Sequence, residues 1–255
     1  MTIEGIDETI DNRLENSARD QTMNETSLVI LPGLDGTEVL FGPLLANLPS
    51  WIKPVVLNYP AAGTNSYEEL IDRVEQRVAS MGKFAVLGSS FGGPLALMLA
   101  ARRPSQVSAV VLCASFVMPP RPELTRFRSI TRTPVIAALR AVRRIRYVIP
   151  GFASNDLRRA KAVLWRRVRA RVLAARSRAV LGVDVRVELR QCAAPLMYLA
   201  FTQDDVVPRA NCDEVKSLAP QTHIVEVAGS HQGLFTNPVP SAVLITEFLK
   251  SHVLE

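Results

Sequence analysis

This sequence has few cysteines and lacks a long apolar run. These two absences argue against a disulfide-rich protein, a cysteine metal site and a membrane-spanning helix. Its 255 residues include only three cysteines, Cys113, Cys192 and Cys212. Their number and spacing match neither a disulfide framework nor a metal site, so we expect free thiols and no bound metal. The longest apolar stretch is about eight residues, near positions 94–101, far below the roughly 20 that a membrane-spanning helix needs. No transmembrane helix is expected.

The first 25 residues lack the basic start and the apolar core of a secretory signal peptide. They are acidic instead, with seven carboxylates against two arginines: Glu4, Asp7, Glu8, Asp11, Glu15, Asp20 and Glu25 against Arg13 and Arg19. This composition predicts a cytoplasmic protein that begins with an acidic tail at residues 1–26. Such a tail is either disordered or docked on a basic surface of the same chain.

Positive charge is concentrated in one segment of the chain. The whole sequence has a net charge of +6, whereas residues 119–190 hold 18 arginines and one lysine against four carboxylates, a net charge of +15. The rest of the chain is therefore acidic, at −9. This asymmetry predicts a basic insert, residues 119–190, within a core made of residues 27–118 and 191–255.

Short apolar runs alternate with longer amphipathic segments outside the insert. A chain of this length can bury one large core, and the alternation predicts a mainly parallel sheet of about six strands with helices on both faces. The expected strands are 28–31, 54–58, 84–88, 107–114, 196–201 and 223–227. The expected helices are 67–81, 91–103, 209–219 and 240–251.

The insert itself shows two amphipathic helical patterns, at 135–148 and 157–181, with arginines opposite the apolar residues. It leaves the core after a strand that ends near Ala114. It should therefore cover the carboxyl edge of the sheet, where ligands bind in such folds. We interpret it as a lid; the alternative is a helical hairpin that only caps the core. In either case we expect its apolar sides to pack on the body.

The segment Gly88-Ser89-Ser90-Phe91-Gly92 is a G-x-S-x-G pattern between an apolar strand and a helix. Glycine on either side of the central serine lets neighbouring backbone pass without a Cβ clash. Ser90 is therefore a candidate nucleophile. A serine hydroxyl is weakly nucleophilic at neutral pH, so it needs a nearby base and a carboxylate that orients this base.

Both partners of such a serine can be found downstream. The chain has three histidines; His223 begins an expected strand and His252 lies close to the C-terminus. His231 lies in a loop just past the last expected strand, so it can project over the same sheet edge as the serine. For the orienting acid, Asp204 and Asp205 both follow the strand 196–201.

The order strand, G-x-S-x-G, insert, D-x-x-V-P and G-x-H resembles the α/β-hydrolase superfamily, of the serine esterase type with a helical lid. The resemblance covers about residues 27–255 apart from the insert, and the family's first two strands are missing. In that family the acid stands four residues before the proline. The resemblance therefore implies Asp204 as the catalytic acid, with Asp205 as the alternative, beside Ser90 and His231.

The turn at residues 31–36 resembles the oxyanion turn of the same family. It implies that the backbone amides of Leu34 and Phe91 bind the oxyanion of the tetrahedral intermediate. Pro32 replaces the usual histidine, which removes a ring often packed behind the turn. Asp35 is unexpected, because an inward carboxylate would repel the oxyanion. We expect it to point away and cap the following segment.

These features together predict a cofactor-free serine hydrolase that cleaves small-molecule carboxylic esters through an acyl-enzyme. Thioesters make nearly the same demands on the site. One alternative is an esterase or thioesterase whose acyl substrate is attached to an acidic carrier protein docked on the basic insert. Others are an anionic membrane surface at the insert, or a ligand-binding relative without catalysis. Nucleic acid is not expected, because the insert has few aromatic residues and no reading motif.

Overall fold

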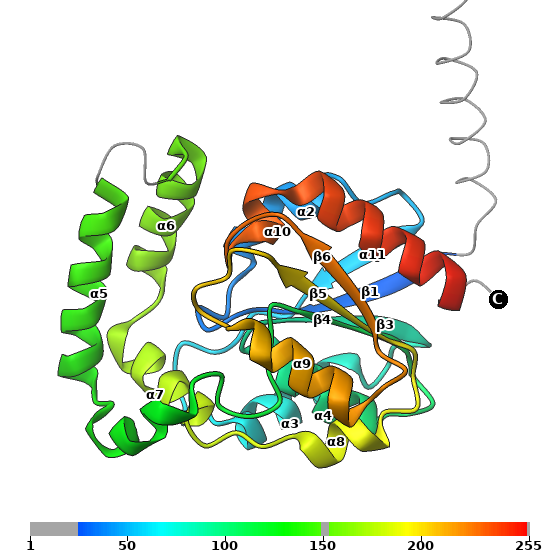
Figure 1. The fold of residues 1–255 in the computed structure, drawn as a ribbon, viewed down its shortest axis with the longest axis horizontal. Helices are drawn as coiled ribbons and strands as arrows, with labels where there is room; N and C mark the ends of the chain where they lie inside the picture. Colours follow the sequence, from blue (N-terminus) through cyan, green and yellow to red (C-terminus); the bar gives the residue numbers. More distant parts are fainter. Residues whose placement is uncertain (1–24, 149–152, 254–255) are drawn as a thin grey trace, which may run out of the picture.

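The computed structural model describes residues 25–148 and 153–253 (Figure 1). Nearly all of the expected acidic tail, residues 1–26, lies outside the described residues, so its disorder or docking stays a prediction. Among the described residues, none of the helices has the length and apolar character needed to cross a membrane.

The core is a six-stranded sheet in the order β2-β1-β3-β4-β5-β6, with every neighbouring pair parallel. This confirms the predicted sheet. All six strands lie within two residues of their expected bounds, and β2 as a whole is displaced by two residues toward the N-terminus. The strands are β1 (Thr26–Leu31), β2 (Ile52–Val56), β3 (Phe84–Ser89), β4 (Val107–Cys113), β5 (Leu196–Phe201) and β6 (His223–Val227).

Apolar side chains cover both faces of the sheet. Along β3, Phe84 and Val86 belong to the apolar cluster on one face, whereas Ala85 and Leu87 belong to the cluster on the other. All four are fully buried, which is why this strand is a continuous apolar run rather than an alternating one. The same alternation holds in β1.

Helices pack on each face of the sheet (Figure 1). One face carries α3 (Tyr67–Val78), α4 (Gly92–Arg102), α8 (Arg186–Gln191) and α9 (Arg209–Leu218). The other carries α2 (Gly42–Leu45), α10 (Gly233–Thr236) and α11 (Pro238–Val253). The four long helices of the core match the expected ones. The short helices α2, α8 and α10, and the 3-10 turn η1 (Glu38–Leu40), were not predicted because they are too short to show a period.

The insert is helical, but one prediction within it is wrong. It comprises η2 (Pro122–Ile130), α5 (Thr133–Val148), α6 (Asn155–Arg167) and α7 (Ala170–Val180). A single helix was expected over 157–181, whereas Val168 is extended at ψ 118° and separates α6 from α7. The Arg140 guanidinium contacts the carbonyl groups of Trp165 and Val168 at this break. A contact from another helix therefore satisfies carbonyls that a continuous helix would bond internally.

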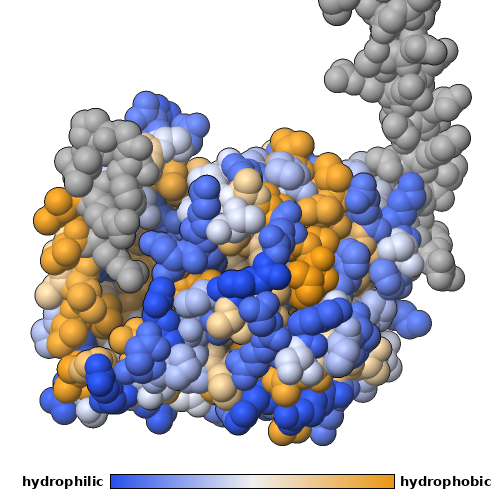
Figure 2. Space-filling view, viewed as in Figure 1, coloured by the Kyte–Doolittle hydropathy of each residue, from blue (hydrophilic) through white to orange (hydrophobic). Residues whose placement is uncertain are grey.

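The expectation that the apolar sides of the insert pack on the body is also wrong for α5. Leu139, Val142 and Ile145 are 54%, 63% and 61% exposed. Figure 2 shows hydrophobic side chains on the surface at the side of the molecule where α5 lies. The helix is the outermost element of the insert and packs against α7 (Figure 1). The side of α5 that carries these three residues therefore faces solvent. By contrast, α6 and α7 bury Leu164 and Val172.

Candidate active site

Ser90 occupies the sharp turn between β3 and α4. Its φ of 51° is in the left-handed region, as the G-x-S-x-G pattern predicts. Two hydrogen bonds hold this strained residue: its amide donates to the Cys113 carbonyl at 2.8 Å, and the Ser115 hydroxyl donates to its carbonyl at 2.7 Å. Sequence reasoning missed Ser115, because nothing local links the end of β4 to the serine turn.

Two glycines let other segments approach this turn. A Cβ on Gly92 would overlap the carbonyl oxygen of Leu31, and a Cβ on Gly93 would overlap the Ser115 hydroxyl. The loops that follow β1 and β4 can therefore lie directly against the serine turn. This close approach explains the paired glycines better than flexibility does, since neither of the two has a positive φ.

The structure brings Ser90, His231 and Asp204 together. The Nε2 atom of His231 lies 3.0 Å from Ser90 Oγ, and its Nδ1 atom lies 2.8 Å from Asp204 Oδ2. The His231 and Asp204 side chains are only 13% and 5% exposed, which limits competition from water. We assign the tautomer with hydrogen on Nδ1, because it then donates to the carboxylate and leaves Nε2 to accept from the serine.

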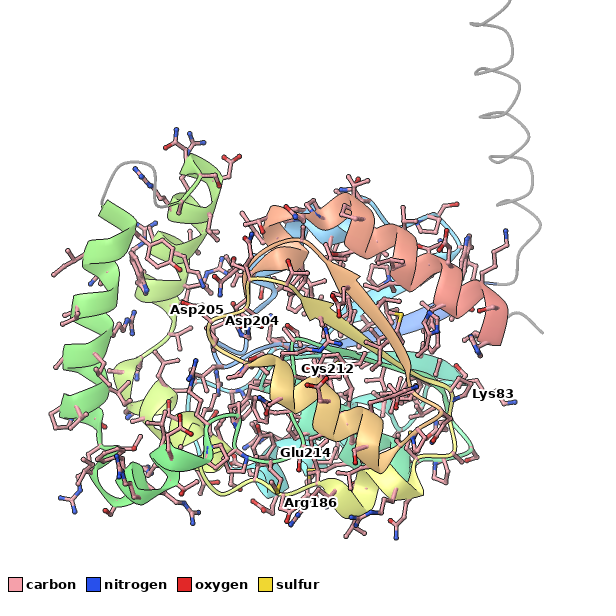
Figure 3. All side chains as sticks on the ribbon, viewed as in Figure 1. Lys83, Arg186, Asp204, Asp205, Cys212 and Glu214 are labelled. Carbon is pink, nitrogen blue, oxygen red and sulfur yellow. The ribbon has the colours of Figure 1, made fainter. Side chains whose placement is uncertain are left out.

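The two adjacent aspartates are placed differently (Figure 3). The second oxygen of Asp204 accepts hydrogen bonds from the amides of Val206 and Val207, at 2.8 and 2.9 Å. The Asp205 side chain is exposed, and its backbone carbonyl accepts a hydrogen bond from Arg121 at 2.7 Å. The geometry therefore favours Asp204 over Asp205 as the partner of His231.

The other two histidines lie away from this site. His223 and His252 both lie against Phe248, with ring centroids 6.3 and 4.6 Å from its ring. His223 begins β6, so it lies at the opposite end of this parallel strand from the serine turn. Within the described residues, no group of three or more potential metal ligands comes together.

The loop after β1 lies beside the serine. A Cβ on Gly33 would be 3.8 Å from the Cβ of Ser90. The amides of Leu34 and Phe91 donate to no acceptor in the described parts of the chain, so both are available to a ligand. The Asp35 carboxylate accepts from the amide and hydroxyl of Thr37, at 3.1 and 2.8 Å, which caps the following segment as expected.

Two tyrosines support the two loops that carry these amides. The Tyr59 hydroxyl donates to the Pro32 carbonyl at 2.8 Å, so this ring supports the turn in which the family's histidine is replaced. The Tyr67 ring stacks on Phe91 at 4.6 Å, and its hydroxyl donates to the Phe91 carbonyl at 3.2 Å. Burial raises the pKa of both hydroxyls well above the ordinary value, so they remain protonated donors. Neither tyrosine was identified from the sequence.

One curated relative shares sequence with this chain. The chain is 29% identical over 224 residues to the biotin biosynthesis bifunctional protein BioHC of Cellvibrio japonicus. The match covers 78% of this chain but 40% of the relative, so the chain spans less than half of that protein.

Solved structures share the fold at lower identity. The enol-lactonase of Burkholderia xenovorans LB400 superimposes with a TM-score of 0.74, at 20% identity, over 89% of this chain and 92% of its own. The bromoperoxidase of Bacillus anthracis does so with a TM-score of 0.77, at 12% identity, over 89% and 93%. These two names denote different activities, so the likeness shows the fold alone.

A family model extends the match to nearly the whole core. The model of the alpha/beta hydrolase family matches residues 28–243, which include the serine turn, the insert and the loops of Asp204 and His231. The parallel six-stranded sheet, flanked by helices, is the fold that the sequence resemblance implied. The chain belongs to the alpha/beta hydrolase family.

Proposed function

We propose that the chain is a serine hydrolase that cleaves carboxylic esters. The observation that carries this proposal is the chain of contacts from Ser90 through His231 to Asp204, at 3.0 and 2.8 Å. His231 removes the proton of the serine hydroxyl as its oxygen attacks the ester carbonyl. The amides of Leu34 and Phe91 stabilise the negative charge that develops on the carbonyl oxygen.

Collapse of this intermediate yields an acyl-enzyme. The imidazolium of His231 gives its proton to the leaving alcohol, and the acyl group stays on Ser90. A water molecule, deprotonated by His231, then attacks the acyl carbon. The bond from this carbon to Ser90 Oγ breaks, the serine oxygen takes the proton back from His231, and the carboxylic acid is released. The Asp204 carboxylate stabilises the imidazolium in both halves of the reaction.

Two considerations support ester chemistry. The nucleophile is a serine, which transfers acyl groups, whereas an aspartate at this turn would favour alkyl substrates such as halides or epoxides. One neighbour by fold is an enol-lactonase, and a lactone is a cyclic ester. Thioesters remain possible substrates because their tetrahedral intermediate needs the same oxyanion donors.

A panel of p-nitrophenyl esters of increasing acyl length tests this proposal. We expect hydrolysis with a preferred chain length, and we expect a fluorophosphonate to label one residue, Ser90, as located by peptide mass spectrometry. The matched control is protein unfolded in guanidinium, which should not react because the serine has lost its base. Neither turnover nor labelling of the folded protein would contradict the proposal.

We further propose that residues 119–190 act as a lid over a core of residues 27–118 and 191–255. In this proposal an acidic carrier protein docks on the lid, and the acyl group that it carries is the substrate. The observation that favours this second candidate is the combination, on one insert, of net charge +15 with the exposed apolar side of α5. Complementary charge steers such an encounter, and apolar contact adds affinity.

The salt dependence of turnover tests carrier docking. The rate on a carrier-bound ester should fall steeply from low to high salt, whereas the rate on the free ester with the same acyl group should not. Arg132→Glu, at an exposed position of the insert between η2 and α5, should weaken only the carrier reaction. Lys83→Glu, an equal charge change at the end of the molecule opposite the insert (Figure 3), should not. Salt-insensitive carrier turnover, with co-sedimentation on anionic lipid vesicles, would assign the face to a membrane surface instead.

A further inference from the structure

Among the described side chains of the insert, Arg176 is the most buried charged one. It projects from α7 into the body of the protein and is only 1% exposed. In the described parts of the chain, no carboxylate lies within ion-pair distance of it. Arginine is almost never fully buried without a charged partner, so this position requires an explanation.

The Arg176 guanidinium bonds two loops of the core. From Nη1 it donates to the carbonyls of Leu34 and Asp35, at 3.0 and 2.7 Å. From Nη2 it donates to the Pro60 carbonyl at 3.0 Å, and from Nε to the Asn65 side-chain oxygen at 2.9 Å. The first two acceptors belong to the loop after β1 and the other two to the loop after β2.

Both loops are shaped around this side chain. Asn65 is buried with a left-handed φ of 52°. Its side-chain nitrogen Nδ2 donates to the Ala62 carbonyl at 3.1 Å, which directs its side-chain oxygen toward Arg176. Gly36 has a φ of 69°, and a Cβ there would overlap the guanidinium. The Tyr59 ring lies 5.3 Å from the guanidinium carbon. The site is therefore specific for a planar group with donors on several sides.

The group remains charged despite its burial. Loss of solvation lowers the pKa of Arg176 to about 10, which is still well above neutral pH. A lysine would keep the charge, but its single ammonium cannot reach acceptors on two separate loops at once. Geometry rather than charge alone is therefore what arginine supplies at this position.

We propose that Arg176 is a positioning residue for the oxyanion hole: from the insert, it fixes the loop whose Leu34 amide binds the oxyanion. This inference rests on the proposed esterase function. The Arg176 guanidinium donates to the carbonyl of Leu34, the residue whose amide is the proposed oxyanion donor. A shift of about 1 Å in a reacting group can cost about 10²-fold in rate, and the loss of one oxyanion donor about 10²–10³-fold.

Substitutions of Arg176 test this role with the free p-nitrophenyl ester. We expect Arg176→Lys and Arg176→Met to lower kcat by about 10–100-fold while KM changes by less than about threefold, because the ground state makes little use of the hole. Rates are expressed per active site, counted with the fluorophosphonate, so that unfolded protein does not contribute. Arg171→Lys and Arg171→Met, on an exposed position of the same helix, are the matched controls and should retain the parent kcat.

A second readout separates positioning from general stability. A trifluoromethyl ketone forms a tetrahedral oxyanion on the serine, so its affinity should fall by the same factor as kcat/KM in the Arg176 variants. If neither variant folds, Asn65→Gly decides: glycine adopts the left-handed φ without strain, yet the acceptor for Nε is lost. Asn65→Gly should lower kcat/KM and the affinity for the trifluoromethyl ketone by the same factor, and this factor should be smaller than in the Arg176 variants.

Parent values of kcat and of inhibitor affinity in every folded variant would overturn the role of Arg176. So would a loss of rate that disappears when it is expressed per active site. Failure of the esterase proposal itself is distinguishable, because the parent protein would then neither hydrolyse the esters nor be labelled at Ser90.

Discussion

Replacing Ser90 with alanine is expected to reduce kcat for ester hydrolysis by a factor on the order of 10⁴ or more. The substitution removes the oxygen that lies 3.0 Å from His231 Nε2, so no acyl-enzyme can form. Residual rate would come from water held near the oxyanion donors, which remain. Because alanine and serine carry nearly the same cost at a φ of 51°, the fold should be retained.

Steady-state rates on the preferred p-nitrophenyl ester measure this loss, with circular dichroism and thermal unfolding as checks on folding. Ser89→Ala is the matched control: it removes an adjacent hydroxyl at the end of β3 that makes no contact with His231. It should keep its kcat within about threefold, because the chain of contacts from Ser90 through His231 to Asp204 is left intact. Full activity of Ser90→Ala would exclude this serine as the nucleophile.

The strands and the order of the site residues could be predicted for a physical reason. Strands buried on both faces are continuous apolar runs, and in a parallel sheet their carboxyl ends share one edge. Ser90, Asp204 and His231 each follow a strand of this parallel sheet, β3, β5 and β6, so their convergence at one edge was predictable without coordinates. The strand pattern alone did not separate Asp204 from Asp205; the family resemblance implied Asp204, and the physical difference is that the amides of Val206 and Val207 orient its carboxylate.

Features that arise only where distant loops meet could not be predicted. The break at Val168 depends on Arg140 from a neighbouring helix, and no glycine or proline marks it. Similarly, nothing in the local pattern around Arg176 distinguishes it from the exposed arginines on either side. Its acceptors lie more than a hundred residues away, on loops whose approach the sheet determines. The exposed side of α5 was missed because an apolar period does not tell which of two sides is covered.

Asp204→Asn is expected to lower kcat by about 10³–10⁴-fold with little change in KM. The amides of Val206 and Val207 donate to Oδ1 of Asp204, so they need an acceptor at this position. The side-chain oxygen of the asparagine should therefore replace Oδ1. Its NH2 group then faces His231 Nδ1 and donates to it. The ring proton is consequently displaced to Nε2, which can no longer accept the proton of Ser90.

Asp205→Asn is the matched control for this change, because it alters the neighbouring carboxylate in the same way. Asp205 is exposed, and its bond to Arg121 uses the backbone carbonyl, which the substitution keeps. We expect its kcat to stay within about twofold of the parent value. The rate of fluorophosphonate labelling should follow kcat in both variants, since the same base activates the serine in each reaction. A large loss in Asp205→Asn together with an active Asp204→Asn would reverse the assignment of the acid and would require the loop after β5 to rearrange during turnover.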